Sequence, residues 1–124
     1  MHILIIPSEN FLTYWSTLGG VFQLDQAKAL DRAGHVIGII GVGFISPKLF
    51  FARNYFDKKE TIENINIIKD YRRSLFPHGL YSFLENKNRY NKLFDLNFSN
   101  YVKRYGLPDL IHAHNVLFAG IIAN

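Results

Sequence analysis

The segment VFQLDQAKALDRAGHVIGIIGVG, residues 21–43, predicts a helix that is followed directly by a strand. Gly34 separates the two halves and is the residue type that most often ends a helix. After it, an apolar run rich in β-branched residues continues to Gly43, which is typical of a buried strand. In the first half, apolar residues recur at every third position, as one face of a helix requires. They are Val21, Leu24, Ala27, Leu30 and Ala33.

On the amino-terminal side, the short apolar run HILII, residues 2–6, stops at Pro7 and predicts a second buried strand. A strand, a helix and a strand within about 40 residues form the right-handed crossover from which parallel sheets are built. We therefore expect an α/β fold.

Further along the chain the same two patterns return. A strand is expected at Ile65–Ile68, and RRSLFPHG, residues 72–79, is expected to be a loop. An amphipathic helix is expected from about Asn88 to Tyr105, followed by a buried strand at DLIHA, residues 109–113, and the start of another helix. The sequence predicts a Rossmann-like parallel sheet of four strands with flanking helices, as one partial domain over residues 1–124.

Composition limits the class of protein. The chain has 124 residues, 48% of them hydrophobic, which suits one domain with a real core. Without cysteine it has neither disulfides nor thiolate metal ligands, which favours a reducing, cytoplasmic address. We expect neither a signal peptide nor a membrane-spanning helix, because the longest apolar runs are far below about 20 residues.

Positive charge is concentrated in the middle of the chain. Residues 48–105 contain twelve Lys or Arg residues and six Asp or Glu residues, although the whole chain carries only +4. Such a region could bind nucleic acid, touch an anionic membrane, or form an ordinary solvated face. No nucleic-acid motif is present, so we expect no nucleic-acid partner. In residues 46–59, SPKLFFARNYFDKK, aromatics alternate with cations, which indicates either a membrane anchor or aromatics packed under the sheet.

Candidate functional residues follow the predicted strands, because open α/β sheets bind ligands at the carboxyl ends of their strands. Gly19 and Gly20 precede the first helix, where backbone amides can approach a phosphate or a sugar hydroxyl. His112 and His114 share one side of the last strand, since side chains alternate along it. We interpret His112 as a structural group hydrogen-bonded to backbone, and His114 as the functional one. The dinucleotide and Walker spacings are missing, and a zinc site would lack further ligands.

Three segments together give a resemblance to a known family. They are ILIIPS, residues 3–8, LGGVFQLDQAKALDRAGHVIGII, residues 18–40, and YGLPDLIHAHNVLFAGIIA, residues 105–123. The combination resembles the amino-terminal domain of group 1, or family 4, retaining glycosyltransferases. Those enzymes have the GT-B fold, in which two Rossmann-like domains face each other across a cleft. The resemblance implies that this chain is a truncated acceptor-side part and that the donor-binding carboxyl-terminal domain is absent from it.

The resemblance also implies roles for individual residues. His114 matches the histidine that hydrogen-bonds the donor sugar and is the expected catalytic residue. Gly19, Gly20 and Asn115 are the expected substrate-binding residues. No metal and no cofactor are expected, the nucleotide sugar being a substrate. The family often has Trp-Tyr-Pro after the segment PS, whereas this chain has ENFLTYWST, residues 9–17, so acceptor specificity does not transfer.

The expected function is therefore that of a nucleotide-sugar-dependent glycosyltransferase in bacterial polysaccharide or glycolipid biosynthesis. Its expected partners are the donor, a glycan or lipid-linked acceptor, the missing domain and, through residues 46–59, the inner face of the plasma membrane. The 124 residues alone are expected to be inactive and to self-associate through an open sheet edge. The alternative is a stand-alone Rossmann-like module that binds a nucleotide or a protein without catalysis.

Overall fold

The computed structural model describes residues 1–7, 11, 20–45, 61–62, 64–73, 87–114 and 120. Two of the three predicted helices and all four predicted strands are present within these ranges. In chain order the elements are β1 (His2–Ile6), α1 (Val21–Arg32), β2 (Val36–Ile45), β3 (Thr61–Ile62), β4 (Ile65–Arg73), α3 (Lys87–Tyr105) and β5 (Leu110–Ala113).

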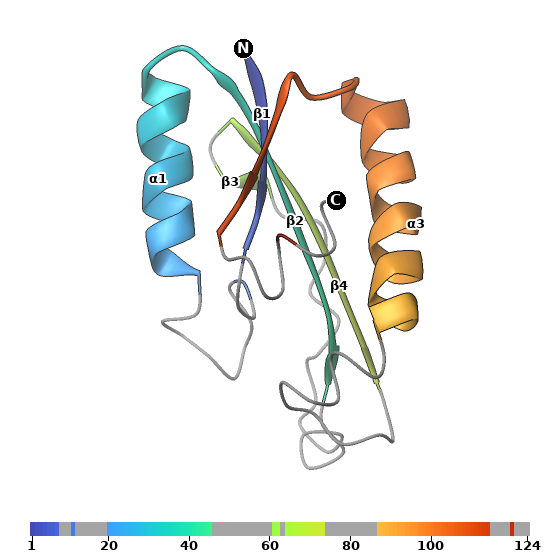
Figure 1. Ribbon diagram of the computed structural model, residues 1–124. Coiled ribbons are helices and arrows are strands. Elements are labelled where there is room, and N and C mark those ends of the chain that lie inside the picture. Colours follow the sequence, from blue (N-terminus) through green and yellow to red (C-terminus); the bar gives the residue numbers. More distant parts are fainter. Residues whose placement is uncertain are drawn as a thin grey trace.

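The strands form one sheet in the order β3-β4-β2-β1-β5. The four longer strands are parallel, and the two-residue β3 pairs antiparallel with β4 at one edge. The chain builds outward from β1 to β2 and β4, and then returns to place β5 on the other side of β1. Figure 1 shows α1 on one face of the sheet and α3 on the other. This arrangement confirms the predicted Rossmann-like α/β sheet.

Alternation along each strand divides the apolar side chains between two cores, one under each helix. On the α1 face, Ile3 and Ile5 of β1 lie with Ile37 and Ile39 of β2 against Ala27. On the α3 face, the other residues of the same strands pack against the helix. These are Leu4, Ile6, Ile40 and Val42 with Leu93, Phe94 and Tyr101. Because β1 and β2 are covered on both faces, they are apolar at nearly every position.

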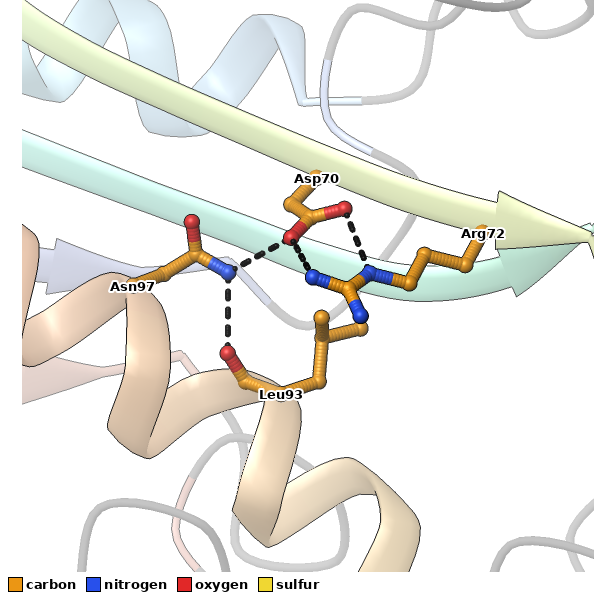
Figure 2. Close-up of polar contacts among 4 residues, drawn as sticks. All are labelled: Asp70, Arg72, Leu93 and Asn97. Carbon is orange, nitrogen blue, oxygen red and sulfur yellow. Dashed lines mark hydrogen bonds and ion pairs between the residues drawn. The ribbon is translucent and has the colours of Figure 1, made fainter.

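A polar contact within the α3 face joins α3 to β4 (Figure 2). The side-chain amide of Asn97 donates hydrogen bonds to the Asp70 carboxylate and to the Leu93 carbonyl, both at 2.8 Å. The Arg72 guanidinium donates two more hydrogen bonds to the same carboxylate, at 3.1 and 2.9 Å. The buried amide of Asn97 is thus satisfied, and it fixes the helix on the strand.

Three details differ from expectation. Arg72 and Arg73, expected in a loop, belong to β4, because β2 continues to Ile45 and pairs with β4 as far as Arg73. The short β3 was not predicted, because two residues are too few to show the alternation of apolar and polar side chains that identifies a strand. The expectation of a buried last strand was wrong: Leu110 and Ile111 of β5 are exposed because β5 is an edge strand, with β1 as its neighbour in the sheet.

Within the described part of the chain, no helix is both long enough and apolar enough to cross a membrane. Residues 46–59, for which the sequence indicates an anchor, lie outside the described residues. So does the helix expected after β5, except for Gly120.

Candidate functional site

The candidate site lies at the carboxyl ends of β1 and β5. The strand order changes direction at β1, since β2 and β4 lie on one side of it and β5 lies on the other. In open α/β sheets, ligands bind outside the carboxyl ends of the strands at such a switch point. We call this part of the molecule the carboxyl edge, and it contains His112, His114, Gly20 and the first turns of α1.

The two histidines project from β5 on the α1 face. His112 pairs with Ile5 in the sheet register, and the His114 backbone N–H donates to the Ile6 carbonyl at 3.1 Å. Their rings are stacked, with 4.8 Å between centroids and 14° between planes. The prediction that both imidazoles share one side of the strand is confirmed.

His112 is tied to α1 by a side-chain contact. Its Nδ1 lies 3.4 Å from the Gln26 Nε2, which can donate to an unprotonated ring nitrogen. The partner of this ring nitrogen is therefore an amide on the neighbouring helix, whereas a backbone group was expected. The reason is that α1 runs alongside the half-buried ring, so that a side chain of the helix reaches it first.

His114 has an unsatisfied polar atom. Its Nε2 is buried and has no hydrogen-bond partner among the residues that the structure describes. Burial, and then the neighbouring His112, lower the pKa of His114 below its ordinary value of 6.5. The ring therefore stays neutral at physiological pH, with one nitrogen as donor and the other as acceptor. A buried imidazole nitrogen without a partner costs free energy that an incoming hydroxyl could recover.

Gly20 begins α1 at this edge. It has a φ of 85°, in the left-handed region that favours glycine, and the helix has no side-chain cap. A Cβ at this position would overlap the ring of Phe11. The first N–H groups of α1 therefore start at the carboxyl edge without a capping side chain. Gly19 and Asn115, the other expected substrate-binding residues, lie outside the described residues.

Phe11 is anchored to β4, and the sequence did not reveal this contact. Its side chain is fully buried, and its backbone N–H donates to the Tyr71 hydroxyl at 2.7 Å. A Cβ at Gly41 would approach both Phe11 and the Tyr71 hydroxyl, so the glycine makes room for this contact. Burial raises the pKa of Tyr71, which keeps the hydroxyl neutral. The only available sequence signal was that Phe11 is one of three aromatic residues, with Tyr14 and Trp15, in the segment after Pro7.

Metal ligands are sparse in this arrangement. The described residues contain no group of three His, Cys, Asp or Glu side chains that could hold a metal ion. The stacked pair of His112 and His114 offers two imidazoles, whereas a zinc site takes three or four protein ligands. The chemistry that the described residues offer is hydrogen bonding by a neutral imidazole and by backbone amides.

Comparison of the chain with protein-family models, with curated proteins and with solved structures finds no significant match to any of the three.

Proposed function

We propose that the chain is the acceptor-side, amino-terminal part of a nucleotide-sugar-dependent retaining glycosyltransferase with the GT-B fold. The observation that carries the proposal is the imidazole of His114 at the switch point between β1 and β5, whose buried Nε2 has no partner among the described residues. A neutral imidazole is suited to a sugar hydroxyl, which both donates and accepts hydrogen bonds.

The remainder of the carboxyl edge supports the same assignment. Glycosyl transfer requires a positioned sugar and electrostatic support for the departing nucleotide diphosphate. The uncapped N-terminus of α1 after Gly20 presents backbone N–H groups that can donate hydrogen bonds to phosphate oxygens. Sugar and phosphate would thus be held by His114 and by α1, respectively. The second Rossmann-like domain of such an enzyme would face the carboxyl edge and carry the nucleotide.

The test uses the protein as its gene encodes it, together with labelled nucleotide sugars and both glycan and lipid-linked acceptors. We expect transfer, and we expect His114→Ala to lower turnover by roughly 100-fold, the scale of losing one positioned polar group. His112→Ala should instead lower mainly the stability, because its ring bridges β5 and Gln26.

Each outcome has a clear meaning. Equal turnover in the wild type and in His114→Ala would remove the site assignment. Binding of nucleotide or protein without transfer of any sugar would favour the alternative, a Rossmann-like binding module. Co-sedimentation with anionic liposomes, compared with a variant in which Phe50 and Phe51 are replaced by serine, tests the proposed anchor in residues 46–59.

A further inference from the structure

Phe22 is the most exposed large apolar side chain among the described residues, with 85% of its surface accessible. It lies in the first turn of α1, directly after Gly20 and Val21. The other exposed apolar side chains of this kind are aliphatic, and none lies on α1. They are Met1, Val36, Leu96, Leu107, Leu110 and Ile111. An aromatic ring left in water loses the free energy that burial would provide, so its place beside the candidate site calls for an explanation.

The contact between Gln26 and His112 shows where Phe22 lies along the direction of β5, because it places one turn of α1 beside one residue of the strand. Phe22 lies one helical turn before Gln26, about 6 Å along α1 toward the carboxyl edge. His114 lies two residues after His112, about 6.6 Å along β5 in the same direction. The crossover helix runs antiparallel to the strands, and Figure 1 shows the end of β5 descending toward the first turn of α1.

Measured along the strand direction, Phe22 and His114 therefore lie at the same position, at the carboxyl edge. Side chains of a helix lean toward its N-terminus, which turns the Phe22 ring further toward the open end of the site. The imidazoles of His114 and His112 stand on the strand, and the phenyl ring stands on the helix beside it. Between them, the described residues offer one apolar surface and one unpartnered polar nitrogen.

This pairing matches the chemistry of a pyranose. The ring of such a sugar has a face of C–H groups and an equator of hydroxyls, so that it binds best to an aromatic face combined with planar polar groups. The C–H groups are weakly positive, and the face of a phenyl ring is negative. On the basis of the proposed function, we propose that Phe22 is the stacking platform for the sugar ring whose hydroxyl is held by His114.

Phe22 is then a determinant of sugar specificity. It selects sugars whose C–H groups gather on one face, and it selects against those with an axial hydroxyl on that face. A nucleobase would also stack on phenylalanine and could present an edge N–H or carbonyl group to Nε2 of His114, so the experiment below includes UDP to distinguish it from a sugar.

The experiment measures binding by ligand-observed NMR with the protein as its gene encodes it. The probes are methyl α-glucoside, methyl α-galactoside, UDP and UDP-glucose. Stacking on Phe22 should shift the C–H signals of one sugar face upfield through the ring current, and one glycoside should bind more tightly than its epimer. Phe22→Leu should weaken sugar binding by about tenfold and abolish the upfield shift, while Phe22→Tyr should retain both.

Leu96→Ala is the matched control, because Leu96 is an exposed apolar residue on α3, on the other face of the sheet. It should leave the shift and the affinity unchanged. Unchanged sugar shifts in Phe22→Leu, or shifts confined to the uracil of UDP, would overturn the inference even if glycosyl transfer is observed. Conversely, stacking of a methyl glycoside in a protein that transfers no sugar would leave the inference standing and refute the proposed function. No binding of any sugar would overturn both.

Discussion

The two ends of the parallel strands are built in opposite ways. At the amino edge, side chains from distant parts of the chain satisfy one another: His2 Nε2 lies 2.6 Å from the Tyr101 hydroxyl, and the His2 backbone N–H donates to the Asp109 carboxylate at 2.7 Å. Nδ1 of His35 is the exception there. At the carboxyl edge, within the described part of the chain, Nε2 of His114 lacks a partner, α1 lacks a capping side chain, and Phe22 is exposed.

This difference separates stability from function within one sheet. Polar groups that satisfy each other contribute to folding and leave little for a ligand. Polar groups held in place without partners cost stability and are retained where something else binds. The predictions below test whether the carboxyl edge is held in a fixed shape and whether its open groups behave as the geometry implies.

The largest effect is expected at the glycine that begins α1. Gly20→Ala should lower the free energy of unfolding by about 3 kcal/mol, because the left-handed backbone and the overlap with Phe11 both act against a Cβ. Gly34→Ala is the matched control: its φ of 87° is similar, but no atom lies within 4 Å of the added Cβ. It should cost only about 1 kcal/mol. Urea unfolding measures both, and equal losses would show that Phe11 does not shape this edge.

The next prediction compares two buried tyrosine hydroxyls, one at each edge. Tyr71→Phe leaves the buried N–H of Phe11 without its acceptor and should cost about 2 kcal/mol. Tyr101→Phe should cost about 1 kcal/mol, because the half-buried His2 can turn to water. Burial also raises the pKa of Tyr101, to about 12, so neither hydroxyl ionises in the range tested.

Hydrogen exchange gives the local readout for this pair. Tyr71→Phe should speed exchange at the Phe11 amide, whereas Tyr101→Phe should leave that amide protected. If both variants, or neither, changed the exchange of the Phe11 amide, the hydrogen bond between Phe11 and Tyr71 of β4 would not be what protects it.

A third, smaller effect is expected on the α3 face, where the buried side-chain amide of Asn97 is satisfied (Figure 2). Asn97→Ala should lower stability by about 1.5 kcal/mol, because it removes two hydrogen bonds from a buried site. Arg72→Ala should cost only about 0.3 kcal/mol, since the pair with Asp70 is exposed on the arginine side. Neither should alter ligand binding at the carboxyl edge. Thermal unfolding with and without ligand checks this, and a reduced ligand-induced shift in Asn97→Ala would show that the two faces are coupled.

How much of this could be predicted from the sequence depends on the range of the interactions. The helices and the long strands follow from local periodicity, so α1 was placed to within one residue at its carboxyl end. The side of β5 that carries both histidines follows from alternation alone. The exposure of β5 does not, because it depends on the strand order, which local patterns do not encode.

Contacts within the site were the least predictable part. The anchoring of Phe11 by Tyr71 joins residues 60 positions apart, and the contact of Gln26 with His112 joins residues 86 positions apart. Both depend on how the helices and strands pack. His112 was predicted to be structural, and its hydrogen-bond partner could be identified only after α1 and β5 had been placed side by side.

The smallest expected effect is the pH dependence that His114 gives to stability. Its pKa lies below 6.5 in the folded protein and near 6.5 in the unfolded chain, so the unfolded state binds a proton first as the pH falls. Stability should therefore be complete above about pH 6.5 and decrease below it. The free energy of unfolding of the wild type should accordingly fall relative to that of His114→Gln as the pH is lowered below about 6.5. His112→Gln removes the smaller of the two causes, so it should raise the pKa of His114 part of the way, while burial, the larger cause, still holds it down. Titration of the His114 ring proton by NMR in both proteins separates these contributions. A pKa at or above 6.5 in the wild type would show that burial and His112 do not act on the His114 ring as the geometry implies.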